Sequence, residues 1–100
     1  MPKLCLTLLC PAAVEEKLLD VLLEVAADGV FTNSPSASHG LAPTRLSSAE
    51  QVMGRSASVL LQVLLDEPAL ELLLALLRNQ FRGTGLRYWA VPVALEGEIE

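Results

Sequence analysis

The side chains that could bind a ligand gather in a polar central stretch and around a glycine turn near the C-terminal end. The central stretch holds the single histidine of the chain, His39, between Ser38 and Gly40. A neutral imidazole can ligate a metal ion, and threefold symmetry could bring three such rings together. A histidine that is only solvated in a loop is the alternative. Four arginines could receive a phosphate or a carboxylate, or could be solvated charges: Arg45, Arg55, Arg82 and Arg87.

Two sulfur-bearing side chains could join His39 in a soft-metal site. Cys10 stands just before the first predicted helix, whose N-terminus can depress a thiol pKa and so favour the metal-binding thiolate. Met53 offers a thioether, which suits soft metal ions. Cys5 lies on the same predicted strand as Cys10 but points to the opposite face, so the two thiols cannot bond to each other within the strand. We expect Cys5 to pack in the core.

The remaining polar candidates give little support to catalysis. Glu50 is either an ion-pair partner of Arg55 or the first-turn acid of a short loop helix. Tyr88 and Trp89 should face opposite ways on one strand, one of them packed in the core or at an interface. The sequence has no convincing Ser/Cys–His–acid set, no glycine-rich phosphate loop opening a helix and no paired carboxylates in an apolar pocket. We therefore expect a protein that is not an enzyme.

Composition sets the scale of the molecule and its class. A chain of 100 residues makes one domain, 1–100, but 52% of its residues are hydrophobic and few are aromatic, an aliphatic excess that predicts an oligomer. The net charge of −5 argues against nucleic acid as a partner. No apolar run is long enough to predict membrane insertion. Two cysteines without a signal peptide predict free thiols in the reducing cytoplasm.

The first half of the chain has the pattern of strand, helix, strand. Residues 3–10 form a near-continuous apolar run that ends at Pro11, where a strand would lose its next hydrogen-bond donor. Residues 12–27 have the spacing of an amphipathic helix, with apolar positions on one face and charges opposite. A weaker strand over 30–36 should be broken by Pro35.

The second half repeats this order. Residues 56–65 form the clearest strand, and they are largely apolar on both faces, which is typical of a strand covered on both sides. Asp66 is a good N-cap and Pro68 suits the first turn of the helix that follows. Gly83 and Gly85 should end that helix before a strand over 86–93. The acidic tail 95–100 could add a short edge segment.

Two strand–helix–strand units joined by a long loop predict an α+β fold. This βαββαβ order fits the ferredoxin-like sandwich, in which a four-stranded antiparallel sheet carries two helices on one face. The long loop, at about 36–54, separates strands two and three and is expected to be flexible. Because the helices can cover only one sheet face, copies of the same chain are the simplest cover for the other.

Four segments of the chain resemble known proteins: residues 31–35 (FTNSP), 38–40 (SHG), 49–55 (AEQVMGR) and 85–89 (GLRYW). They look like the PII and CutA superfamily and, within it, an uncharacterised bacterial PII-like family often encoded near heavy-metal efflux pumps. This resemblance implies a homotrimer whose sheets face inward. The expected ligand site lies at the subunit clefts and the loop base: Ser38, His39, Gly40, Glu50, Arg55, Arg82 and Arg87.

The chain also departs from the nucleotide sensors of that superfamily. Their long glycine- and lysine-rich turn is reduced here to residues 82–85, and the central loop has no tyrosine. The main hypothesis is a trimeric regulator that senses a small anion, nucleotide or metal and reports it to a transporter or efflux pump through its loop. The alternatives are a CutA-type metal-binding protein using His39, Cys10 and Met53, and an interaction module without a ligand. The sequence does not identify a cofactor.

Overall fold

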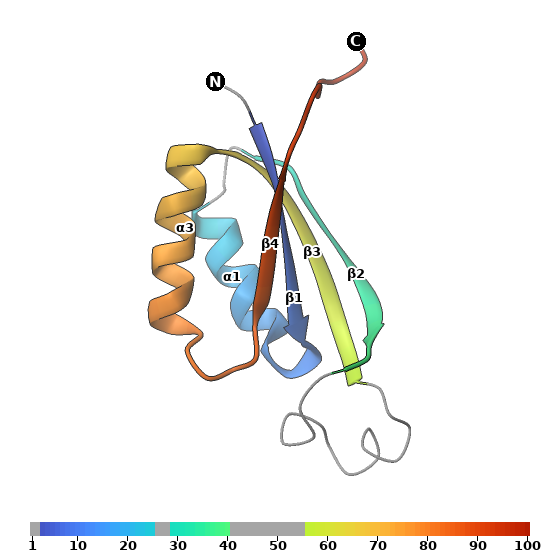
Figure 1. The fold of residues 1–100 in the computed structure, drawn as a ribbon, viewed down its shortest axis with the longest axis vertical. Helices are drawn as coiled ribbons and strands as arrows, with labels where there is room; N and C mark the ends of the chain where they lie inside the picture. The colour runs from blue at the N-terminus through green and yellow to red at the C-terminus, as the bar shows by residue number, and fades with distance from the viewer. Residues whose placement is uncertain (1–2, 26–28, 41–55) are drawn as a thin grey trace.

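A computed structural model describes residues 3–25, 29–40 and 56–100 of the chain, and its layers are shown in Figure 1. The sheet has the strand order β2-β3-β1-β4 with antiparallel neighbours, and both described helices cover the same face. This α+β arrangement is the predicted ferredoxin-like sandwich. The described elements are β1 (Lys3–Pro11), the 3-10 turn η1 (Ala12–Val14), α1 (Glu15–Val25), β2 (Phe31–Ser38), β3 (Ser56–Asp66), α3 (Glu67–Gln80) and β4 (Arg87–Pro92).

Two boundaries in the first half differ from the sequence prediction. The predicted helix over 12–27 opens as the 3-10 turn η1, and α1 begins only at Glu15, whose carboxylate suits the positive end of the helix dipole. The predicted break at Pro35 is wrong, because β2 runs through it in continuous register with β3. An edge strand tolerates proline where the missing N–H would face away from the sheet.

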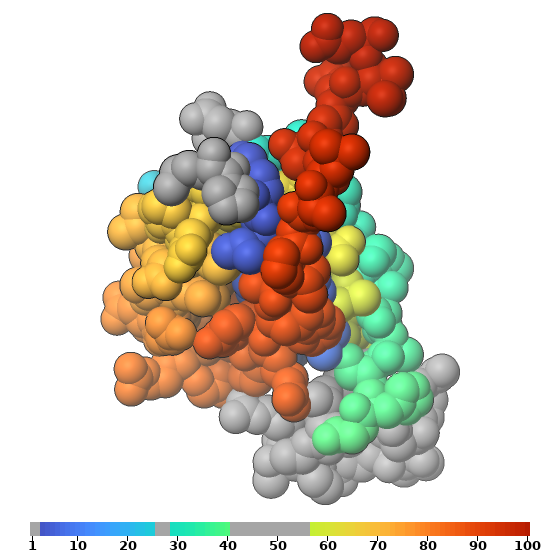
Figure 2. All heavy atoms as spheres, turned by 45° about the horizontal axis from the view of Figure 1, so that its top comes forward, coloured from blue at the N-terminus to red at the C-terminus, as the bar shows by residue number. Residues whose placement is uncertain are grey.

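The elements of the second half begin and end as their capping residues predict. Asp66 is confirmed as the N-cap of α3, since its Oδ1 accepts a hydrogen bond of 3.0 Å from the backbone N–H of Ala69. Gly83 and Gly85 adopt positive φ angles of 79° and 88°, which turn the chain from α3 into β4. The predicted edge segment over 95–100 is wrong, since these residues form no strand and project from the body (Figure 2).

The core lies between the helices and one face of the sheet. Alternate residues of β1 and β3 supply its floor, as the period of two requires. The largest side chains with no exposed surface are Leu6, Leu8, Leu18, Leu22, Leu61 and Leu73. Burying one leucine fully stabilises the fold by roughly 1.5–3 kcal/mol. This shared leucine core fixes the positions of the sheet edges and of the connections at their ends.

The opposite sheet face, called the open face here, has no described element covering it. Along β1 it carries Cys5, Thr7 and Leu9, which lie opposite Leu64, Gln62 and Leu60 of β3. The β4 side adds Trp89 and Val91, about half exposed at 47% and 51%. The β2 side is polar, and there the Ser38 and Ser58 hydroxyls lie 2.6 Å apart in a hydrogen bond. The prediction that Cys5 packs in the core is wrong, because it lies on this open face.

Candidate functional site

The end of β2 and the turn between α3 and β4 lie toward the same end of the molecule (Figure 1). They belong to opposite sheet edges, however, because β3 and β1 separate β2 from β4. Three interstrand steps amount to roughly 14 Å. One chain therefore does not bring Ser38, His39 and Gly40 to Arg87, although all four were predicted to serve one ligand.

The residues at the end of β2 have different surroundings. Ser38 is buried and its hydroxyl is engaged with Ser58. His39 follows it and is exposed. Gly40 has a φ of 79°, a conformation in which a side chain would be strained. This backbone holds His39 at the surface, at the point where the chain leaves the β2 edge.

Four predicted candidates lie outside the described residues: Arg45, Glu50, Met53 and Arg55. Their predicted roles in a ligand or metal site stay predictions. Within the described residues, no group of three or more His, Cys, Asp or Glu side chains could hold a metal ion.

Cys10 lies before the first helix, as predicted, but the pKa of its thiol is raised and not depressed. The side chain has no exposed surface, and its burial, with the nearby charge of Glu15, raises its pKa to about 11. Loss of hydration disfavours the thiolate, and the negative charge of Glu15 disfavours it further. Cys10 belongs to the hydrophobic core and is a neutral thiol near pH 7. This environment does not favour it as a metal ligand.

The basic residues around the C-terminal turn point to two different surfaces. Arg87 opens β4 and lies opposite Leu9, which places it on the open face. Tyr88 pairs with Leu8 and so lies on the helix side, whereas Trp89 pairs with Thr7 on the open face. The prediction that the two aromatic residues face opposite ways is confirmed. Arg82 stays exposed in the turn that follows α3.

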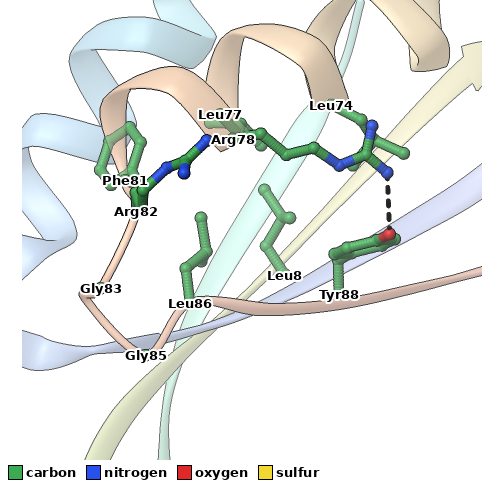
Figure 3. A pocket seen from close by; sticks show the side chains of 10 residues that line it. All are labelled: Leu8, Leu74, Leu77, Arg78, Phe81, Arg82, Gly83, Gly85, Leu86 and Tyr88. Carbon is green, nitrogen blue, oxygen red and sulfur yellow. Dashed lines mark hydrogen bonds between the residues drawn. The ribbon is translucent and has the colours of Figure 1, made fainter.

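A cavity of about 360 Å³ lies between the C-terminal half of α3 and the start of β4 (Figure 3). Sequence reasoning did not predict it. A signal was present, since Arg78 stands near the end of the second predicted helix and Tyr88 falls on the strand that follows it. The lining residues are Leu8, Leu74, Leu77, Arg78, Phe81, Arg82, Gly83, Gly85, Leu86 and Tyr88.

The chain has a ferredoxin-like fold, which solved PII-like proteins share. The family model described as a protein of unknown function, DUF3240, matches residues 1–100, and the chain belongs to this family. No curated protein matches the chain.

Three solved structures show how widely the fold is shared. A DUF3240 family protein from Shewanella baltica OS155 is similar with a TM-score of 0.79 and 15% identity, over 98% of this chain and 97% of that one. CPII is a nitrogen regulatory PII-like protein from Thiomonas intermedia K12, solved with ADP, AMP and bicarbonate. It is similar with a TM-score of 0.73 and 16% identity, over 99% of this chain and 98% of that one. A functionally unknown protein from Pediococcus pentosaceus ATCC 25745 is similar with a TM-score of 0.70 and 10% identity, over 99% of each chain. The predicted PII-like resemblance is thus confirmed as a fold.

Proposed function

We propose that this chain is a PII-like regulatory protein that assembles as a homotrimer and binds a small anionic ligand, first of all an adenine nucleotide, at the clefts between subunits. It binds and reports this ligand and does not transform it. The observation that carries the proposal is the separation of the candidate ligand residues onto the two edges of one sheet. Such residues can meet only when the β2 edge of one copy approaches the β4 edge of another.

The open face supplies the reason to assemble. Leu9, Leu60 and Leu64 are only partly buried in the single chain, and Trp89 and Val91 are about half exposed beside them. Apolar surface removed from water contributes about 25 cal/mol per Å². Covering these side chains with the same face of other copies would stabilise a closed assembly, and the polar β2 side would lie at its rim.

The proposed cleft has an electrostatic basis. Arg82 and Arg87 of one copy would lie beside Ser38 and His39 at the β2 end of the next. Arginine can bind phosphate or carboxylate oxygens through two parallel hydrogen bonds. The short turn, with glycines at 83 and 85, lets backbone approach a ligand closely. A nucleotide is the first ligand to test because CPII, which shares this fold, has been solved with ADP and AMP.

Ligand binding would be signalled to a partner protein through the segment between β2 and β3, which starts next to His39. A ligand at the cleft would favour one arrangement of this segment over another, and a membrane transporter or efflux pump is the class of partner we propose to recognise it. The choice of an efflux partner rests on the family resemblance alone. We place the protein in the cytoplasm because Cys5 and Cys10 are free thiols, as a reducing compartment favours. In the described part of the chain, no helix has the length and apolar character needed to cross a membrane.

Isothermal titration with two ligand sets tests the proposal against its rivals. ADP or AMP should bind saturably, and Arg87→Gln should weaken binding about tenfold, since a hydrogen bond to a charged group contributes roughly 1.5–3 kcal/mol. Lys17→Gln removes a charge on α1 and should leave nucleotide binding unchanged. Tight binding of copper, zinc or cobalt that His39→Ala abolishes, without nucleotide binding, would favour the metal-binding alternative. If neither the nucleotides nor the metal ions bind, the alternative of an interaction module without a ligand is favoured.

A further inference from the structure

The cavity between α3 and β4 has a deep apolar floor within a single chain. Its floor is formed by Leu8, which has no exposed surface, and by Leu77, which is 4% exposed. Figure 3 shows Leu8 and Leu86 pointing up toward the helix, beneath Arg78 and Leu74. The volume of about 360 Å³ is at the lower end of the range for small-ligand pockets.

Two arginines line this cavity, Arg78 from α3 and Arg82 from the turn that follows it. Because α3 ends at Gln80, Arg82 lies beyond the helix, and Figure 3 shows its guanidinium beside Phe81, away from that of Arg78. Arg78 reaches across to β4, where its Nη2 donates a hydrogen bond of 3.1 Å to the Tyr88 hydroxyl oxygen, and its guanidinium lies 6.0 Å from the ring centroid. A guanidinium carries five N–H donors, so this bond leaves most of them for a ligand. Among the described residues, no carboxylate pairs with either arginine.

The turn that carries Arg82 is held in place by its own hydrogen bonds. The Thr84 hydroxyl donates to the Phe81 carbonyl oxygen at 2.7 Å and accepts from the Leu86 N–H at 3.3 Å. Gly83 and Gly85 line the cavity and present no side chains to it. A binding site with fixed walls loses less conformational freedom when a ligand enters. This side of the cavity is therefore already organised for an occupant.

We propose that this cavity binds a small amphipathic carboxylic acid of about the size of octanoate, with its hydrocarbon chain among the leucines and its carboxylate at Arg78. A nucleobase or sugar fits the lining poorly. Apart from the Tyr88 hydroxyl, the polar side chains here are cationic, so the donors and acceptors of a base would be left unpaired against leucine. A hydrocarbon chain has no such groups, and one carboxylate can accept hydrogen bonds from the Arg78 guanidinium. This site is independent of the proposed subunit cleft.

Titration of the full chain with octanoate, octanol and acetate tests the proposal. Octanoate should bind saturably. Octanol and acetate should bind at least tenfold more weakly, because octanol lacks the carboxylate and acetate lacks the long hydrocarbon chain. Arg78→Met keeps much of the apolar side chain but removes the charge, and should weaken octanoate binding about tenfold. Arg87→Met is the matched control, because Arg87 lies on the open face, and it should leave octanoate binding unchanged.

Filling the cavity gives a second variant. Leu74→Trp adds bulk at the cavity wall and should abolish octanoate binding while the thermal unfolding midpoint and circular dichroism stay close to those of the original chain. The proposal is overturned if octanoate does not saturate, if Arg78→Met binds it as well as the original, or if Arg87→Met weakens its binding as much as Arg78→Met does. Since Arg78 belongs only to this cavity and Arg87 only to the cleft, failure of octanoate binding and failure of nucleotide binding are distinguishable.

Discussion

At the scale of single residues, the burial of a side chain affects its pKa more than its position relative to a helix end does. Cys10 stands where a helix N-terminus can lower a thiol pKa, yet its pKa is raised to about 11 because it is enclosed by the core and lies near Glu15. The residue pattern could place Cys10 before a helix. It could not show that the side chain points under the helices, since this depends on which face of β1 they cover.

This enclosure predicts a specific loss of stability in alkali. The folded-state pKa of Cys10, about 11, lies above the ordinary thiol value of 9.0, so the folded chain keeps a proton that the unfolded chain releases. The free energy of unfolding should therefore be undiminished below about pH 9 and fall as the pH rises toward 11, by about 1.4 kcal/mol for each pH unit in that window. Urea unfolding at pH 8 and pH 10.5 measures this fall.

Two substitutions isolate the contribution of Cys10. Cys10→Val fills a similar space without a titrating group and should lose less stability between the two pH values than the original chain. Cys5→Ser retains Cys10 and should show the full fall. An equal loss in the original chain and in Cys10→Val would mean that the thiol does not carry the effect.

At the scale of elements, the positions of residues that act only on the neighbouring backbone were the easiest to predict. Asp66 as N-cap, Pro68 in the first turn and the glycines after α3 all act through local backbone chemistry, and each is found as expected. Pro35 was predicted to break β2, but its effect depends on whether the strand lies at an edge or in the centre of the sheet. Strand order is set by contacts far apart in the sequence, which no local pattern contains.

The cap of α3 should have a measurable effect on stability. Asp66→Ala removes the acceptor of the Ala69 N–H and should lower the free energy of unfolding by about 1 kcal/mol. Glu71→Ala, at an exposed position in the middle of α3, is the control and should change it by less than about 0.5 kcal/mol. Chemical denaturation of the original chain and both variants measures these differences. Equal unfolding midpoints for the original chain and Asp66→Ala would show that the cap does not contribute to stability.

At the scale of the whole molecule, the sequence predicted the open face better than the site. The apolar side chains on both faces of β3 indicated that something covers the second face, and Leu60 and Leu64 do lie there. The division of His39 and Arg87 between opposite edges could not be predicted, because it follows from the order β2-β3-β1-β4. The cavity lined by Arg78 was missed for a related reason, since it forms only where α3 packs over β4.

The proposed homotrimer predicts that a charge on the open face prevents assembly. Leu60→Glu would place a carboxylate in the covered centre, at a cost of several kcal/mol unless it is protonated or finds a partner. Leu60 is only partly buried in the single chain, so the substituted chain should still fold. Leu72→Glu, on an α3 position that is 72% exposed, should keep the assembled mass. Light scattering should give a trimer for the original chain, and a monomer there would refute the assembly.

The prolines of the two outer strands limit how the sheet can grow. Pro35 lies within β2 and Pro92 ends β4, so each edge of the sheet contains a residue that cannot donate a backbone hydrogen bond. A foreign strand laid along either edge would meet a gap in the ladder. A leucine-rich chain of this size would otherwise be prone to open-ended stacking through its edges. The two prolines should therefore disfavour the addition of a strand at either edge, while the open face remains available for an assembly of limited size.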